Sequence, residues 1–330
     1  MNRALGALLG ILALAVPAAA DPERGPARRG AGAPIPPPTK IGVSERARLS
    51  IEPSGRAITK LAIENPLGDV KIEGYDGTSI QIESHKVAPD EDALDRLHIS
   101  LVPNPDGTVS IKTTADGGKE VRPIGRAQVR IDLLIRAPRD AHFEAAVTSG
   151  TLEVTNMDAG GDLDTASGPI SVRNVQGEVM THSISGATRL AQVFGSVEAQ
   201  TLSSDVDLDT IGGERLVASV HHGRIDGRRV RARDVELTTT EGRIILEAEA
   251  ALRGHIVVSS FKGDIDVQLR RHGAVMVRAR GARLDLGAPV QTQPNGWGEL
   301  AFGTGNTTAL VEIRSPQGNV KFAIIETRQP

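Results

Sequence analysis

The fold is decided by a short stretch that begins SGTLEV at residues 149–154 and then repeats. It returns as SGPISV at 167–172, as SGATRL at 185–190 and as SSDVDL at 203–208. The copies therefore follow one another with a period of 18, which is kept three times in succession. A fixed period in this range is typical of a solenoid, in which one supersecondary unit stacks on its neighbours.

Apolar residues fall at fixed places in each copy, two residues apart, with glycine at the start. Because successive side chains of a strand point to opposite faces, a spacing of two indicates β-structure and not helix. We therefore expect an all-β protein, a single-stranded β-helix or β-solenoid with about 18 residues per coil and irregular β caps. The inward columns are predicted to be Leu152, Ile170, Thr188 and Val206, and next to them Val154, Val172, Leu190 and Leu208.

Polar residues also recur one period apart. One column is Asn156, Asn174, Gln192 and Thr210; the other is Thr165, Ser183, Thr201 and Ser219. Stacked amides and hydroxyls can hydrogen-bond along the axis and to backbone groups at the corners. We interpret both columns as structural.

The N-terminal 40 residues differ in composition from the rest. Residues 1–20 have the positive, apolar and small-residue regions of a secretory signal peptide, and 21–40 form a linker rich in Pro and Gly. The solenoid domain is expected at 41–326, with regular coils over about 149–286 and a C-terminal cap over 287–326, where the last strands form a hairpin. The one short helix is expected from Asp90, as N-cap, to Leu97.

Composition excludes several classes of function. The chain has no Cys, so it has no disulfide, thiolate metal site or cysteine nucleophile. A net charge of -3 and an aromatic content of 2% argue against nucleic acid as a partner. No apolar run after the signal peptide is long enough to span a membrane. We predict no cofactor.

The stretch ENPLGDVKIEGYD at 64–76, the serial Ser-Gly pieces and SPQGNV at 315–320 resemble the bacterial "putative adhesin" β-solenoid domains, a family of exported or membrane-linked proteins. The resemblance covers about residues 58–326. It implies a right-handed β-helix and supplies no catalytic residues. Fold by itself does not imply function.

The densest basic cluster is Arg228, Arg229, Arg231 and Arg233. It is a candidate contact for an anionic polymer such as an acidic polysaccharide. Its acidic neighbours favour local neutralisation instead. Those neighbours are Asp226, Asp234 and Glu236.

Two other groups of residues could carry chemistry. Asp205, Asp207 and Asp209 alternate along one strand and could bind calcium or line a polysaccharide-cleaving groove, but Arg189 and Arg228 in neighbouring coils favour charge-paired columns. Adjacent residues of a strand point to opposite faces, so His221 and His222 are expected to be a poor metal site at a surface turn. We predict no metal ligands and no catalytic residues.

The sequence therefore favours a non-enzymatic, exported β-solenoid, periplasmic or secreted, that offers a binding or scaffold surface in the cell envelope to polysaccharide or protein. One alternative is a carbohydrate-active β-helix enzyme, which needs two carboxylates facing each other across a groove. Another is a self-assembling polymer similar to the bactofilins. The signal peptide argues against this polymer, because those filaments are cytosolic.

Overall fold

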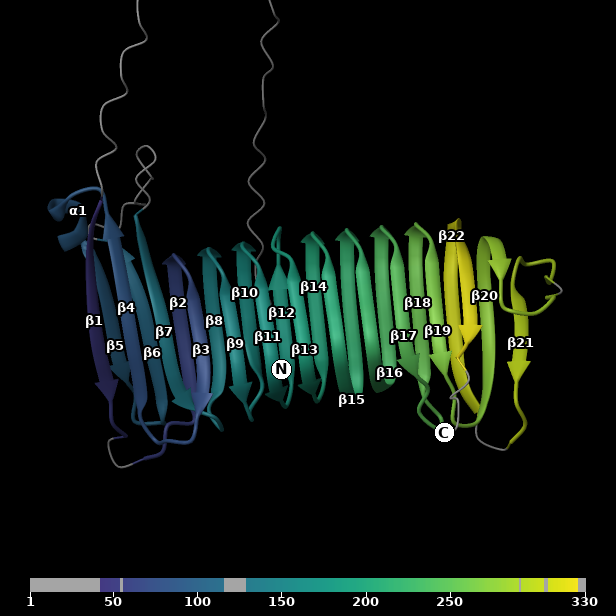
Figure 1. The fold of residues 1–330 in the computed structure, drawn as a ribbon, viewed down its shortest axis with the longest axis horizontal. Coiled ribbons are helices and arrows are strands. Elements are labelled where there is room, and N and C mark those ends of the chain that lie inside the picture. Colours follow the sequence, from purple (N-terminus) through teal and green to yellow (C-terminus); the bar gives the residue numbers. More distant parts are fainter. Residues whose placement is uncertain (1–41, 54–55, 116–128, 291, 306–307, 326–330) are drawn as a thin grey trace, which may run out of the picture. The chain divides into compact units, whose positions relative to one another are not determined.

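The repeated stretch forms strands that pair in parallel with the same strand of the next copy (Figure 1). Ile170 of β11 (Ile170–Gln176) lies opposite Leu152 of β9 (Leu152–Met157) and opposite Thr188 of β13 (Thr188–Phe194). The predicted all-β, solenoid-like arrangement is confirmed. The computed structural model describes residues 42–53, 56–115, 129–290, 292–305 and 308–325.

The strands form two ladders, which share a core. In ladder I the order is β1 (Val43–Ile51), β4 (Ile80–Ala88), β7 (Arg130–Pro138), β3 (Val70–Tyr75), β9, β11, β13, the first parts of β15 (Val206–His222) and β16 (Ile225–Glu241), β17 (Ile244–Glu249), β19 (Ile265–Arg270), the second part of β22 (Thr308–Ile324) and the end of β20 (Ala274–Asp285).

Ladder II is built from the other half of each coil. Its order is β5 (Leu97–Pro103), β6 (Thr108–Ala115), β2 (Lys60–Leu67), β8 (His142–Ser149), β10 (Gly161–Ser167), β12 (Val179–Ser183), β14 (Val197–Ser203), the second parts of β15 and β16, β18 (His255–Lys262), the first parts of β22 and β20, and β21 (Gly298–Phe302).

The inward side chains of both ladders make one continuous core of aliphatic columns. Val172 is fully buried and lies between Val154 and Leu190 of the adjacent coils, as the repeat predicts. Leu163 of β10 is its fully buried counterpart on ladder II. Burial of such side chains stabilises the fold by about 1.5–3 kcal/mol each.

The first polar column marks a corner where the backbone is left-handed. Asn156, Asn174, Gln192 and Thr210 have φ values of 59°, 53°, 56° and 58°, and Arg229 continues the column at 51°. Asn174 Nδ2 donates to Asn156 Oδ1 at 2.8 Å, which confirms the stacking expected for this column. Asn tolerates positive φ better than most residues because its short side chain can hydrogen-bond locally.

The second polar column faces inward, with one correction to its membership. Thr165, Ser183 and Thr201 are buried and in register, but the next coil places Val220 opposite Thr201 and turns Ser219 outward. The prediction for Ser219 was wrong because that coil has one more residue than the period of 18. The column resumes at Thr239 and Ser260, whose hydroxyls donate to the carbonyls of Gly223 and Gly242 at 3.3 and 3.1 Å.

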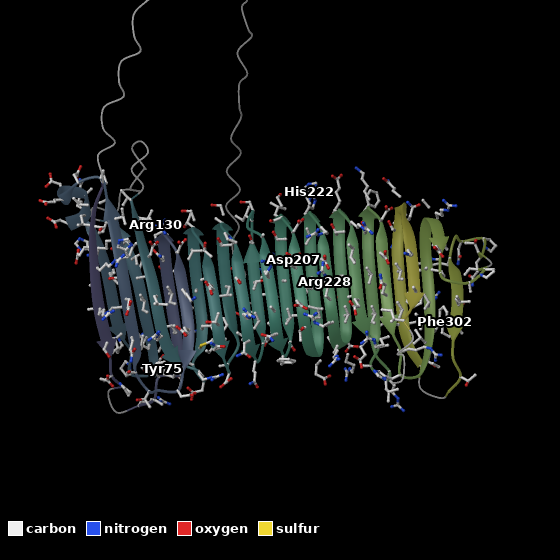
Figure 2. The ribbon with its side chains drawn as sticks, in the orientation of Figure 1. Tyr75, Arg130, Asp207, His222, Arg228 and Phe302 are labelled. Atoms are coloured by element: carbon white, nitrogen blue, oxygen red, sulfur yellow. The ribbon has the colours of Figure 1, made fainter. Side chains whose placement is uncertain are left out.

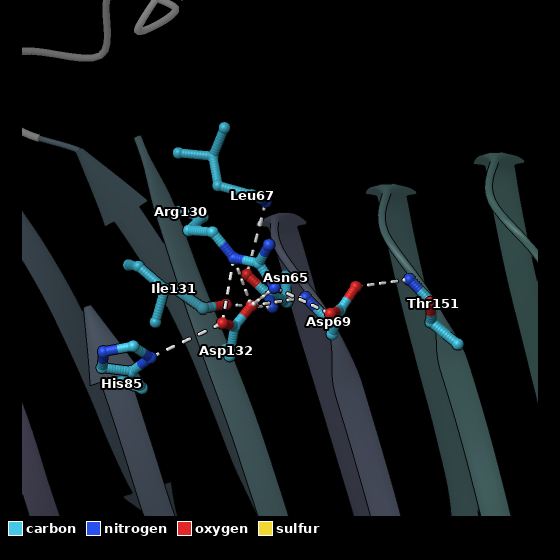
Figure 3. A network of polar contacts seen from close by, with 8 residues as sticks. All are labelled: Asn65, Leu67, Asp69, His85, Arg130, Ile131, Asp132 and Thr151. Carbon is cyan, nitrogen blue, oxygen red and sulfur yellow. Dashed lines mark hydrogen bonds and ion pairs between the residues drawn. The ribbon is translucent and has the colours of Figure 1, made fainter. Parts of the chain in front are cut away.

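At the N-terminal end the strands are out of sequence order. The strands β2 and β3 lie between β6 and β7 on one side and β8 and β9 on the other. A polar network joins β3 to both neighbours: Arg130 Nη2 donates to Asp69 and Asp132 at 2.7 Å each, and Thr151 N donates to Asp69 Oδ1 at 2.7 Å (Figure 3). The hydrogen bond with Asp132 raises the pKa of Arg130.

The same segment turns through Gly68, which has a φ of 130°. A Cβ at this position would lie 2.3 Å from the carbonyl oxygen of Ile131, so only glycine fits. Next to it, buried Asn65 donates to the same carbonyl at 2.8 Å and accepts from Thr113 Oγ1 at 2.6 Å. The stretch at 64–76, which carries the family resemblance, therefore stabilises the inserted strands β2 and β3 through these contacts.

The C-terminal end also departs from sequence order, and the expected hairpin cap is wrong. Residues 308–324 form one continuous strand, β22, inserted in parallel between β18 and β19 on one side and β20 on the other (Figure 1). Ser315 and Gly318, which were expected in the hairpin turn, instead make a corner of a coil: Ser315 Oγ donates to Gly263 O and accepts from Gly318 N.

Among the described strands, three of the four ladder ends are antiparallel pairs, and the fourth is the end of β20, which pairs in parallel with β22. At one end β1 pairs with β4 and β5 with β6, and at the other β21 pairs with β20. The single described helix, α1 (Glu91–Asp95), has the predicted N-cap, since Asp90 Oδ1 accepts from Ala93 N at 2.8 Å.

Two predictions fall on residues that the structure does not describe: the signal peptide at 1–20 and the linker at 21–40. Within the described ranges, no helix is long and apolar enough to cross a membrane.

Candidate binding surface

All four arginines of the basic cluster lie on β16, and each is paired with a carboxylate. Arg229 also donates to Thr210 Oγ1 at 2.9 Å, and the hydrogen bond that Arg228 donates to Asp226 raises the pKa of Arg228. The pairs are Arg228 with Asp226 at 3.0 Å, Arg229 with Asp209, Arg231 with Glu249 at 2.9 Å, and Arg233 with Glu214 at 3.1 Å and Asp234 at 3.0 Å. Local neutralisation is therefore present, with Glu249 and Glu214 rather than Glu236 as partners.

The row Asp205, Asp207 and Asp209 lies on the outer surface of ladder I. Asp207 accepts from Arg189 at 3.2 Å and from Arg224 at 3.3 Å, and Arg228 lies close by (Figure 2). Asp207, Asp209 and Arg228 border a hollow of about 420 Å³. The expected charge-paired columns are confirmed, although Arg228 bonds Asp226 and not its cross-strand neighbour Asp209.

His221 and His222 do not diverge as expected. Both are exposed, and their ring centroids lie 4.2 Å apart in an edge-to-face arrangement. The two side chains do not point to opposite faces because β15 ends here at a corner, where Gly223 has a φ of 152°. His222 Nδ1 lies 3.4 Å from Glu241 Oε2, so this ring has a carboxylate neighbour at the edge of the strands (Figure 2).

A groove runs along the outer surface of ladder II, across β10, β12, β14, β15 and β16. Its volume is about 560 Å³. One wall is an apolar row in which Ile184 and Leu202 are 56% and 51% exposed. The other is a polar column with one residue from each coil: Asp164, His182, Gln200, Ser219 and Thr238.

Two hydroxyl groups beneath this groove have no partner in the described part of the protein. Thr165 and Thr201 are 5% and 6% exposed, line the groove, and their Oγ1 atoms make no hydrogen bond to described residues. A buried hydroxyl without a partner is unfavourable by about 1–3 kcal/mol. Because their column faces inward, these two hydroxyls lie on the core side of the strand backbone and do not face a molecule in the groove.

The same surface carries carboxylates without a basic partner. Asp162, Asp164, Glu198 and Glu236 take part in no ion pair with described residues, and β10, β12 and β14 contain no Lys or Arg. Burial raises the pKa of Asp162, and the carboxylates of Glu144 and Asp164 raise it further. The field over β10, β12 and β14 is therefore negative, whereas other parts of ladder II carry ion pairs, such as Lys60 with Glu144 and Lys112 with Glu64.

The groove was missed at the level of the sequence, although a signal was present. Ala166, Ile184 and Leu202 recur at the period of 18 directly after the inward column of Thr165, Ser183 and Thr201. Residues next to an inward position point outward, so two large aliphatic residues in that row indicate an exposed apolar patch.

Similar solved structures are bacterial. A "putative adhesin" from Bacteroides fragilis is 12% identical, with 84% of this chain and 97% of that chain covered and a TM-score of 0.34. One from Parabacteroides distasonis is 10% identical (85% and 98% covered, TM-score 0.39), and a "putative lipid binding protein" from the same species is 11% identical (86% and 97%, 0.37). At these values the similarities say nothing about what this chain binds.

No protein of curated function matches the chain. The profile of the Toastrack DUF4097 family matches residues 58–323, which is most of the chain and nearly the whole range in which the resemblance was expected. The strands that it spans, from β2 to the second part of β22, include every regular coil. This chain belongs to the Toastrack DUF4097 family.

Proposed function

We propose that this protein is a non-enzymatic, exported β-solenoid that acts as a binding or scaffold surface in the bacterial cell envelope, and that its ligand lies along the outer surface of ladder II. The observation that carries the proposal is the groove itself. It combines an exposed apolar row at Ile184 and Leu202 with the outward polar column that runs from Asp164 to Thr238.

The shape of the groove favours an extended ligand. Each coil contributes one residue to the polar column and one to the row beside it, which is apolar at Ala166, Ile184 and Leu202 and continues in the next two coils as His221 and Thr240. A repeating surface suits a repeating or extended partner, either an envelope polysaccharide or a polypeptide. Export rests on the signal peptide predicted at residues 1–20, and the periplasm or the cell exterior is the proposed location.

We also propose that the solenoid is right-handed and that its coil period is about 18 residues. In support, Ile170 pairs with Thr188 and Thr188 with Val206, each one full period further on. Beyond β15 the coils lengthen, since Val206 pairs with Ile225 and Ile244 with Ile265.

The basic cluster stays a second candidate contact for an anionic polymer. Arg228, Arg229, Arg231 and Arg233 would have to exchange their present carboxylate partners for those of a ligand. A carbohydrate-active enzyme is the weaker alternative: Asp207 and Asp226, neighbours across β15 and β16, both accept hydrogen bonds from arginines. Both carboxylates are thus held by arginines on one outer surface, whereas the enzyme needs two carboxylates that face each other across the scissile bond.

The proposal is tested by binding of the mature chain to a glycan array and to purified envelope fractions. We expect the double variant Ile184→Ser, Leu202→Ser to lose binding. The matched control is Phe194→Ser, because Phe194 is also 51% exposed but lies on ladder I. Equal binding by the double variant and the control would remove the groove as the site. If binding is lost only in a variant with the four arginines changed to Ser, the basic cluster is the binding site instead of the groove.

A further inference from the structure

Three side chains on the outer surface of ladder II converge from two neighbouring coils. His142 and Glu144 are two residues apart on β8 and therefore point to the same side of the strand. Asp162 of β10 lies directly opposite Glu144 in the ladder. One potential ligand atom from each residue lies within 4.8 Å of the other two, and all three side chains are partly buried.

We propose that His142, Glu144 and Asp162 form a binding site for a divalent transition metal ion, with Zn²⁺ the best match. The ligand set is one imidazole nitrogen and two carboxylate oxygens. Zn²⁺ accepts this mixture, whereas Ca²⁺ and Mg²⁺ prefer oxygen ligands alone. The proposal departs from the expectation, based on sequence, that the chain has no metal ligands.

The geometry is compatible with such an ion after small side-chain rotations. Zn–N and Zn–O bonds of about 2.0–2.2 Å place ligand atoms roughly 3.4 Å apart in a tetrahedral site. The three atoms start within 4.8 Å of one another, on side chains that are not locked in the core. Three protein ligands leave at least one coordination position for water or another molecule.

The surroundings favour a cation at this point. The charged or titratable groups that act on Asp162 are the carboxylates of Glu144, Asp164 and Glu178 and the imidazole of His142. Lys60 of β2 donates to Glu144 Oε1, which leaves the second oxygen, Oε2, for the metal. A hydrogen bond to a ligating carboxylate is the common way in which proteins orient such a ligand.

The site adjoins the groove, because Asp164 lines the groove and lies two residues from Asp162 on the same strand. An ion held here would offset part of the uncompensated negative charge of this surface. Its open position could then hold an anionic group of the ligand, and this consequence alone rests on the proposed function. Metal binding itself does not depend on it.

The test is a titration of the untagged mature chain, freed of metal by a chelator, with ZnCl₂ near neutral pH, followed by calorimetry. Cobalt(II) absorption gives an independent view of the coordination. We expect one ion per chain, and at least about tenfold weaker binding in both His142→Ala and Asp162→Asn. Bound Zn²⁺ should also raise the melting temperature of the wild-type chain and not of these variants.

The matched controls are His221→Ala and Glu236→Gln, which alter a histidine and a carboxylate on the same ladder outside the site. Both should bind Zn²⁺ as the wild type does. Absence of binding, or binding that is weakened by His221→Ala and unchanged by His142→Ala, would overturn the proposal. Because no groove ligand is present in the titration, either result leaves the groove as the proposed binding surface unaffected.

Discussion

The two ladders are halves of the same coils, yet their outer surfaces differ in how charge is arranged. On ladder I, carboxylates such as Asp207 and Asp209 are matched by arginines from the same or the neighbouring coil. On ladder II, Asp164 and Glu198 have no Lys or Arg partner among the described residues, and an apolar row lies beside them. A surface that neutralises itself needs no ligand, whereas one that leaves charge and apolar area uncovered is suited to binding.

The largest effect is expected for substitutions in the core, which both ladders share. Val172→Asp on ladder I and Leu163→Asp on ladder II each place a carboxylate in a fully buried column. Each should lower the free energy of unfolding by about 3 kcal/mol or more, because an unpaired charge is buried. Chemical denaturation measures this. An unchanged midpoint for either variant would show that the inward register of that ladder is wrong.

A smaller effect is expected at the left-handed corner within the strands of ladder I. Asn174 has a φ of 53°, a conformation that costs a residue with a Cβ about 1–2 kcal/mol unless its side chain compensates locally. Asn174→Ala should be destabilised by about 1 kcal/mol. Asn174→Gly relieves the backbone strain and loses only the hydrogen bond to Asn156. Thermal melting should therefore rank Gly above Ala, and the opposite order would contradict the backbone explanation.

The difference between the outer surfaces can be tested by removing one charge from each. Arg189→Ser breaks an exposed pair with Asp207 and should destabilise the chain by less than about 1 kcal/mol. Asp164→Asn removes a carboxylate that has no ion pair with described residues and should leave stability unchanged or slightly increased. Denaturation at low and high salt measures both. A clear loss of stability in Asp164→Asn would show that the Asp164 carboxylate has a stabilising charge partner.

The smallest expected effect is the contribution of Glu249, on ladder I, to the pH dependence of stability. The hydrogen bond from His272, with the nearby charge of Arg231, lowers the pKa of Glu249 below its usual 4.5. A carboxyl group with a lowered pKa in the folded state contributes stability above its unfolded pKa and loses it as pH falls through the folded value. Glu249→Gln should flatten the stability profile below about pH 4.5, and Glu236→Gln on ladder II should not. If Glu249→Gln and the wild type had the same dependence of stability on pH, the pairing of Glu249 with His272 would be contradicted.

Much of the fold followed from the repeat, because a period of 18 with apolar residues two apart determines which side chains face inward. Val154, Val172 and Leu190 lie in one column as predicted. The order of the coils was not predictable in this way. The insertion of β2, β3 and β22 depends on pairing between strands that are distant in sequence, and Ser219 shows that one added residue shifts a column.

The candidate site was harder to predict, because charge pairing depends on which residue stands one coil away. The basic cluster is conspicuous because its arginines are close in sequence, yet Arg231 meets Glu249 of the following coil and Arg229 meets Asp209 of the preceding one. The carboxylates of ladder II are spread singly over several strands. Only the register shows that no Lys or Arg of the described strands lies opposite them.

The most direct test of the central claim is a hydrogen-exchange comparison of the mature chain with and without an envelope fraction that it binds. The account predicts protection in β10, β12 and β14 of ladder II and no change in β11 and β13 of ladder I. Protection confined to β11, β13 and the first part of β16, with ladder II unchanged, would contradict it.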